Sequence, residues 1–154
     1  MKKRNALPVL IDLSKTSADQ AAKELQSLIK ARADADNQLE MLHTYRQDYA
    51  VRMQQAGLTG MSASNYHNFS RFISTLDDAI AQQNRSIQNL EIKLDDQRRN
   101  WLSEKRRLNS YETLQDRYRA QQQMIDNRNE QRRNDEASLN LYQRARQQAE
   151  KRHP

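Results

Sequence analysis

Apolar residues recur along residues 66–125 at alternating spacings of three and four, and no glycine or proline interrupts the chain between Met61 and His153. Thirteen of the eighteen positions in this repeat are apolar or aromatic. The eighteen positions are Tyr66, Phe69, Ile73, Leu76, Ile80, Gln83, Ile87, Leu90, Leu94, Gln97, Trp101, Glu104, Leu108, Tyr111, Gln115, Tyr118, Gln122 and Ile125. A repeat sustained over so many heptads is typical of a coiled coil, in which one apolar seam packs against a partner helix. The pattern predicts a helix over about 65–147, on the order of 120 Å long, which needs a partner.

A second and weaker repeat precedes this one and predicts the partner helix over about 12–55, with Asp12 or Ser14 as its N-cap. Its positions are Ala18, Ala21, Leu25, Leu28, Arg32, Ala35, Leu39, Leu42, Arg46, Tyr49, Met53 and Ala56. Arg32 and Arg46 interrupt the apolar seam. Either a register shift or a seam that is only partly closed is compatible with these two arginines.

Both glycines of the chain, Gly57 and Gly60, lie between the two repeats. Because glycine interrupts helices, we place a single turn at about 56–64, with Ser62 or Ser64 as the N-cap of the second helix. Helices folded back about this turn bring together residues whose numbers add up to about 120. The predicted fold is all-α and spans residues 1–154 as one domain. It is a long antiparallel two-helix coiled coil, an α-hairpin with unequal arms, in which the second helix is the longer.

Composition excludes several other kinds of protein. Two glycines and two prolines are too few for the many turns of a β or βαβ fold. Without cysteine the chain has no disulfide, no thiolate metal site and no cysteine nucleophile. Hydrophobic residues make up 36% of the chain, which is low for a compact domain but sufficient for a seam that needs two positions in seven. The sustained repeat favours this coiled coil over disorder, the competing interpretation of so polar a sequence.

The sequence offers no pattern typical of catalysis. Its three histidines, His43, His67 and His153, lie far apart and form no metal-ligand spacing. The paired acids 77–78 and 95–96 are helix neighbours, whose side chains diverge by about 100° and cannot share a site. We therefore expect no enzyme activity, no cofactor or metal, and no small-molecule substrate.

Membrane insertion and secretion are not expected either. A membrane-spanning helix needs about 18 or more apolar residues in a row, and the sequence has no such run. Residues 2–4 are basic and precede an apolar stretch at 6–13, but Pro8 and Asp12 interrupt that stretch. We therefore expect no signal peptide and a cytoplasmic protein.

Positive charge is concentrated toward the C-terminus. Residues 1–97 carry 12 Lys+Arg and 12 Asp+Glu, whereas residues 98–154 carry 14 and 8, so the second part accounts for the whole net charge of +6. Arginine is the commoner base there and suits bidentate contacts with carboxylates or phosphates. A solvated helix and an acidic protein partner are both compatible with this charge. Nucleic acid is disfavoured because acids are interspersed and no base-reading motif accompanies them.

Two short stripes near the turn predict a shared surface. The stripes are Gln38, Leu42, Tyr45 and Tyr49 on the first helix, and Phe72, Leu76, Ala79 and Gln83 on the second. Because paired residue numbers add up to about 120, the two stripes lie at one height along the hairpin. They form either a locally wide core or an exposed patch for a partner, and the sequence favours neither.

Several segments match a known pattern: residues 72–80 (Phe-Ile-Ser-Thr-Leu-Asp-Asp-Ala-Ile); Trp101, Lys105 and Leu108 followed by Leu-Gln-Asp-Arg at 114–117; and residues 38–42 with Tyr45 and Tyr49. With these segments the chain resembles the FliJ family of flagellar type III export proteins over nearly its whole length. The resemblance implies a stalk-like coiled coil, similar to the central stalk of rotary ATPases. Such a protein binds the hexameric export ATPase ring, promotes its assembly, couples it to the membrane export gate and associates with export chaperones. It is cytoplasmic and peripheral at the cytoplasmic face of the inner membrane.

The resemblance also implies site residues and favours the exposed patch. Export-gate binding falls to Gln38, Leu42, Tyr45, Tyr49, Phe72, Leu76, Ala79 and Gln83, although Gln83 replaces the histidine of the family. ATPase-ring binding falls to the arginine-rich terminal part, at Arg117, Arg119, Arg128, Arg132 and Arg133. The alternative is a generic basic coiled coil that binds nucleic acid or a membrane surface.

Overall fold

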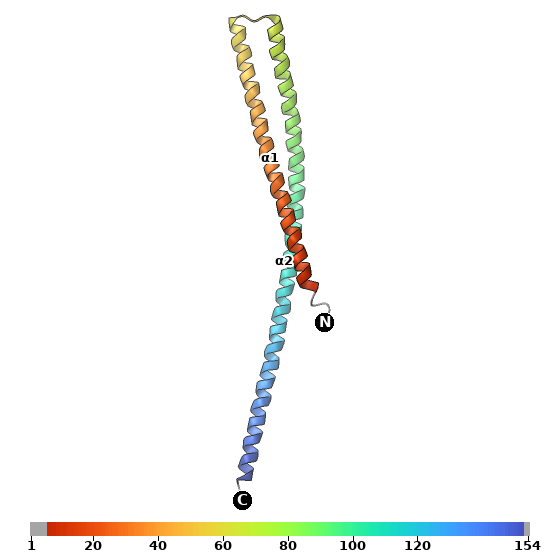
Figure 1. The fold of residues 1–154 in the computed structure, drawn as a ribbon, viewed down its shortest axis with the longest axis vertical. Coiled ribbons are helices and arrows are strands. Elements are labelled where there is room, and N and C mark those ends of the chain that lie inside the picture. Colours follow the sequence, from red (N-terminus) through yellow and green to blue (C-terminus); the bar gives the residue numbers. More distant parts are fainter. Residues whose placement is uncertain (1–5, 153–154) are drawn as a thin grey trace. The chain divides into compact units, whose positions relative to one another are not determined.

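The computed structural model describes residues 6–152, which form two α-helices, α1 (Ala6–Thr59) and α2 (Ala63–Lys151) (Figure 1). No strand is present among these residues. The prediction of an all-α fold with two packed helices, of which the second is longer, is therefore confirmed. The basic residues 2–4 and His153, used in the sequence predictions, lie outside the described residues.

Helix α1 begins before residue 12, so Asp12 and Ser14 lie inside the helix and do not cap its start. Pro8 is in the first turn, where a backbone N–H has no intrahelical acceptor, and proline is therefore tolerated there. Leu7 and Ser14 are buried and Ile11 is half-buried. These three residues continue the spacing of the weaker repeat toward the N-terminus, which explains the earlier start.

The turn between the helices is confined to residues 60–62. Gly57 lies within α1, whereas Gly60 has a φ of 94°, a conformation that favours glycine and ends the helix. Ser62 caps α2, because its hydroxyl oxygen accepts a hydrogen bond from the backbone N–H of Asn65 at 3.2 Å. Of the two predicted caps, Ser62 is the one used, and of the two glycines only Gly60 makes the turn.

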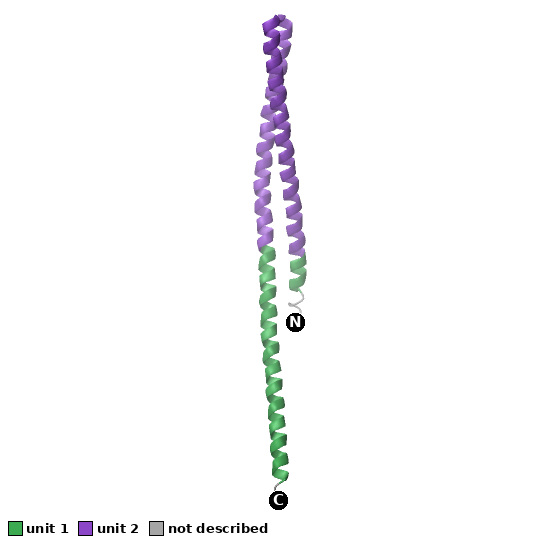
Figure 2. Ribbon diagram, turned by 90° about the vertical axis from the view of Figure 1, so that its left-hand side faces the viewer, with its two compact units in different colours: residues 1–12, 107–154 green, residues 13–106 purple. Residues whose placement is uncertain are grey.

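The chain divides into two units, which are coloured in Figure 2. Residues 13–106, the hairpin unit, contain the pairing of α1 with α2. Within it, the side-chain amide of Gln97 on α2 donates a hydrogen bond to the main-chain oxygen of Ala21 on α1, and that of Gln83 donates to the main-chain oxygen of Ala35. The residue number falls on α2 as it rises on α1, so the two helices are antiparallel. Residues 1–12 and 107–154 make up the terminal unit, which is described separately below.

The predicted seam forms the core. All twelve seam positions of α1 are buried or half-buried, and so is every seam position of α2 from Phe69 to Gln115. Leu76, Ile87 and Leu94 are the buried residues of α2. From residue 116 to residue 152 every residue is exposed. Burial therefore ends at Gln115 and does not reach Ile125, the last position of the repeat in the sequence.

The two arginines of the α1 seam are half-buried without disturbing its spacing. The Nη2 of Arg32 donates to a carboxylate oxygen of Glu91 at 2.7 Å. Arg46 donates through two nitrogens to the carboxylate of Asp77. A long arginine stem can cover apolar surface while its charged group reaches outward to an acid. The arginines thus mark neither a register shift nor an open seam.

Candidate partner-binding surfaces

The eight residues predicted for gate binding lie in two different environments of the hairpin unit. Gln38 is exposed, and Tyr45 and Phe72 are 49% and 42% exposed. Leu76 is only 8% exposed and belongs to the core. The remaining four are half-buried and are Leu42, Tyr49, Ala79 and Gln83. The stripes are therefore neither wholly core nor wholly exposed. Leu76 belongs to the core, whereas Gln38, Tyr45 and Phe72 are exposed to a partner.

An aromatic cluster joins the two helices at this surface. The ring of Tyr49 on α1 lies with its centroid 4.2 Å from that of Phe72, at an interplanar angle of 32°. It meets Phe69 edge-on at 6.3 Å, and the guanidinium of Arg52 lies 5.7 Å from its centroid. Aromatic pairs of this kind contribute about 0.5–1.5 kcal/mol beyond their buried area. Contact with Tyr49 therefore fixes Phe72 in place while leaving part of its ring exposed.

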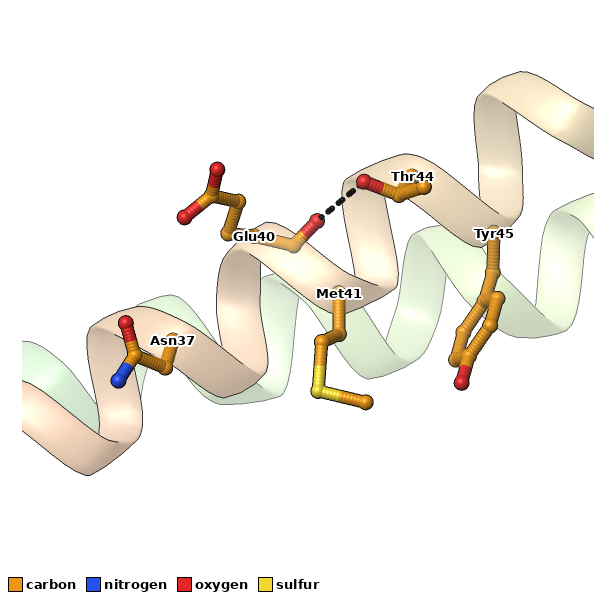
Figure 3. A pocket seen from close by; sticks show the side chains of 5 residues that line it. All are labelled: Asn37, Glu40, Met41, Thr44 and Tyr45. Carbon is orange, nitrogen blue, oxygen red and sulfur yellow. Dashed lines mark hydrogen bonds between the residues drawn. The ribbon is translucent and has the colours of Figure 1, made fainter.

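The surface continues on α1 into a shallow hollow, drawn in Figure 3. The side chains of Met41 and Tyr45, one helical turn apart, project to the same side of the helix, and both are exposed (Figure 3). The Thr44 hydroxyl donates to the main-chain oxygen of Glu40 at 3.1 Å, which turns it back onto its own helix. We did not predict a role for Met41. Its spacing of four from Tyr45, outside the seam, is the sequence signal that could have revealed it.

Polar contacts between α1 and α2 are also made by residues at and next to this surface. The amide nitrogen of Gln83 donates to the main-chain oxygen of Ala35 at 2.9 Å and to the side-chain oxygen of Gln38 at 3.2 Å. The hydrogen bond from Arg46, aided by its positive charge, holds the pKa of Asp77 below the ordinary value for aspartate. Gln83 is thus a structural contact between the helices as well as a surface residue.

The five arginines predicted for ATPase binding lie in a stretch of α2 that we call the arm, residues 116–152, in which every residue is exposed. The five are Arg117, Arg119, Arg128, Arg132 and Arg133. None of them forms an ion pair with any other described residue. The described ion pair of the arm joins Arg146 to Glu150 at 3.8 Å. The five guanidinium groups are therefore available to an external partner.

Apolar residues accompany these arginines. Tyr118, Met124 and Ile125 are exposed on the arm. Within the terminal unit, a groove of about 390 Å³ is lined by Leu7, Pro8, Gln115, Tyr118, Arg119, Gln121, Gln122 and Ile125. Tyr118 and Ile125 are seam positions of the α2 repeat. This part of the repeat therefore presents its apolar side chains to a groove and to solvent, next to basic groups.

Comparison with known proteins identifies the family. The profile of the FliJ family, described as flagellar FliJ protein, matches residues 2–147. The chain belongs to the FliJ family. It is 32% identical over 136 residues to the flagellar FliJ protein of Salmonella typhi, which covers 88% of this chain and 92% of that protein. It is 29% identical over 136 residues to the flagellar FliJ protein of Escherichia coli strain K12, with the same two shares.

Membership of the FliJ family makes the chain a component of flagellar protein export, and it confirms the resemblance seen in the sequence. The relatives are named as flagellar proteins, which fits a role without catalysis. Across residues 6–152 no group of three or more His, Cys, Asp or Glu side chains could hold a metal ion. In the same range neither helix is long and apolar enough in any one stretch to cross a membrane.

Proposed function

We propose that this FliJ-family chain is a non-catalytic coupling protein of flagellar export. It binds the hexameric export ATPase through the arm, promotes assembly of the ATPase ring, and binds the membrane export gate through the surface near the turn. It also associates with export chaperones and works at the cytoplasmic face of the inner membrane. The observation that carries the proposal is the presence of two exposed surfaces of different chemistry, one aromatic and one rich in arginine.

The aromatic surface has the properties of a protein-binding site. Large aromatic side chains that stay exposed in a folded protein are typical of contact surfaces, and a few such residues usually dominate the binding energy. Tyr45 and Phe72 are exposed on different helices, and Phe72 contacts Tyr49, which lies one helical turn from Tyr45. A partner that binds both residues therefore recognises the paired helices and not a single segment.

The arm has the properties of a surface for an acidic protein. Arginine binds carboxylates in a bidentate manner, and the five arginines have no ion-pair partner within the described chain. Exposed Tyr118 and Ile125 add apolar contact area next to them. Acidic residues interspersed along the arm would repel a phosphate backbone, and this disfavours nucleic acid as the partner. A protein partner that presents carboxylates to these arginines fits this surface better.

The experiment that tests the gate surface changes exposed residues only. The variant Tyr45→Ala/Phe72→Ala should weaken binding to the cytoplasmic part of the export gate by roughly tenfold to a hundredfold, because aromatic hot-spot residues commonly contribute about 2 kcal/mol or more. Titration calorimetry with the purified gate fragment measures the change. Circular dichroism should show unchanged helicity, since neither residue is in the core.

A matched control removes a similar apolar area from exposed residues outside the proposed gate surface. Ile29 and Ile92 are exposed apolar residues of the hairpin unit, again one on each helix. The variant Ile29→Ala/Ile92→Ala should bind the gate like the intact chain. The assignment would be contradicted if Tyr45→Ala/Phe72→Ala bound the gate as tightly as the intact chain, or if Ile29→Ala/Ile92→Ala were weakened to the same extent. Leu76→Ala is unsuitable for this purpose, because truncating a buried leucine destabilises the hairpin itself.

A further inference from the structure

Two glutamines of α2 lie in the apolar seam and reach across to α1. The amide nitrogen of Gln97 donates to the main-chain oxygen of Ala21 at 3.2 Å and to a carboxylate oxygen of Glu24 at 3.2 Å. Alanine leaves room at the seam for the amide to approach a helix carbonyl that is otherwise covered by side chains. These hydrogen bonds form only when Gln97 of α2 lies level with Ala21 and Glu24 of α1 along the hairpin.

The second glutamine repeats this arrangement fourteen residues away. Gln83 donates to the main-chain oxygen of Ala35 and to the side-chain oxygen of Gln38. Ala35 and Gln38 follow Ala21 and Glu24 by fourteen residues on α1, and Gln83 precedes Gln97 by fourteen on α2. The two sets therefore have the same antiparallel geometry, separated by two heptads.

The cross-helix ion pairs follow the same interval. Arg32 pairs with Glu91 and Arg46 pairs with Asp77, so both members are again displaced by fourteen residues. We call the two sets clamps. The first clamp contains Ala21, Glu24, Arg32, Glu91 and Gln97, and the second contains Ala35, Gln38, Arg46, Asp77 and Gln83. In both clamps, α1 contributes an alanine, a side-chain acceptor and an arginine, and α2 contributes an acid and a glutamine.

We propose that the two clamps lock the axial register of the hairpin, and that without them α1 and α2 can slip past each other by one heptad. Apolar seam contacts discriminate weakly between registers, because they recur every seven residues. A one-heptad slip of about 10.5 Å keeps leucines and isoleucines in the seam. It places Gln83 against Leu28 in place of Ala35, and leaves the glutamine amides without their carbonyl acceptors. Because the clamps recur every fourteen residues, this slip disrupts both of them at once.

The end of α1 can supply the chain length that such a slip requires. A one-heptad shift needs about seven residues near the turn to leave the helix. Gly57 lies there, within the last turns of α1, and glycine is the least costly residue to unwind from a helix apart from proline. A slip would also carry Phe72 about two helical turns away from Tyr49. The clamps thus hold together the two-helix surface proposed above to bind the gate, although the lock itself does not depend on that function.

Paired cysteines can report the register, because the chain has no cysteine of its own. Leu39 and Ile80 lie between the contacts of the second clamp, so the pair Leu39→Cys/Ile80→Cys reports the native register. The pair Leu39→Cys/Ile73→Cys reports a one-heptad slip, since a disulfide forms only when the two Cα atoms lie within about 7 Å. Both pairs are to be oxidised in the otherwise intact chain and in the variant Gln83→Leu/Gln97→Leu. Leucine at these seam positions keeps the coiled coil folded, which circular dichroism verifies.

In the intact chain we expect a cross-link only in the native pair. In Gln83→Leu/Gln97→Leu the slipped pair should cross-link roughly tenfold above the background level of the intact chain, as expected when one or two net hydrogen bonds cease to discriminate between registers. The matched control Gln82→Leu/Gln88→Leu changes two exposed glutamines and should leave the slipped pair uncross-linked. A slipped pair that stays uncross-linked in the seam variant, or that cross-links equally in the control or the intact chain, overturns the proposal.

Discussion

The hairpin unit and the arm share the helix α2 but differ in what their side chains contact. In the hairpin unit, seam residues are buried and glutamines and arginines make hydrogen bonds across to α1. In the arm every residue is exposed, and the described side-chain contacts are spaced by four along one helix, such as Gln122 with Asp126. Pairs of that kind contribute only about 0.2–0.5 kcal/mol each.

This difference separates the part of the sequence that stabilises the fold from the part that is open to partners. Burial of apolar area is the main source of stability, and it is confined to residues up to Gln115. The arm has exposed Leu139, Leu141 and Tyr142 but no burial to stabilise it. Truncations in the two regions should therefore have unequal effects.

The largest expected effect comes from truncating leucines in each region. Leu94→Ala removes a side chain that is 2% exposed and should lower the free energy of unfolding by about 2–5 kcal/mol. Leu141→Ala removes one that is 66% exposed and should change it by less than about 0.5 kcal/mol. Urea unfolding followed by circular dichroism measures both. Comparable losses in the two variants would show that the arm is also part of the core.

A smaller effect is expected at the two glycines, which sharpens the comparison by testing the hairpin closure. Gly60→Ala forces a Cβ onto a residue with a φ of 94° and should destabilise the chain by about 1 kcal/mol or more. Gly57→Ala replaces a helical glycine with open space around it and should stabilise the chain by about 0.5–1 kcal/mol. The two melting temperatures should move in opposite directions. If both moved the same way, the turn would not be at residues 60–62.

The smallest effect concerns pH. The pKa of Asp77 is lowered by Arg46 in the folded chain, so this carboxylate adds stability above its unfolded pKa of about 3.9 and loses that contribution as pH falls through the folded value. Asp77→Asn should therefore melt below the intact chain at neutral pH. The difference should shrink as pH falls below the unfolded pKa and disappear only below the lower, folded pKa. Both side chains of the pair are partly exposed, at 40% and 49%, so solvent screening keeps the difference small.

Asp135→Asn provides the matched control in the arm, where no cross-helix pair is described for this residue. It should melt like the intact chain at neutral and at acid pH. A pH-independent loss in Asp77→Asn would instead indicate that the carboxylate is needed for packing and not for its charge.

The sequence predicts the fold well because the heptad spacing of a seam can be recognised within each helix, without knowledge of its partner. Spacing identified the seam residues from Phe69 to Gln115, although it also extended the seam to exposed positions, and it narrowed the cap of α2 to two serines, of which Ser62 is used. The start of α1 could not be placed, because Pro8 reads as a helix breaker unless its position in the first turn is known. Likewise, Gly57 and Gly60 read alike, although only one has a positive φ.

The candidate surfaces were harder to predict, since they depend on which way a side chain faces across two helices. Phe72 and Leu76 share one stripe by spacing, yet one is exposed and the other is in the core. Gln83 reads as a polar gap in the seam, and its hydrogen bond to the Ala35 carbonyl needs the partner helix to be in place. The same holds for Arg46, whose acid lies on the other helix.

Hydrogen exchange of the full chain, alone and with the export ATPase, tests most directly the division between a folded hairpin and an arm open to partners. Alone, amides at 13–106 should exchange slowly and those of the arm quickly, because only the former are covered by cross-helix packing. The ATPase should slow exchange in the arm and leave the hairpin unit unchanged, and Arg128→Glu/Arg132→Glu/Arg133→Glu should abolish that protection. Slow exchange of the free arm, or protection by the ATPase that falls only on the hairpin unit, would contradict the account.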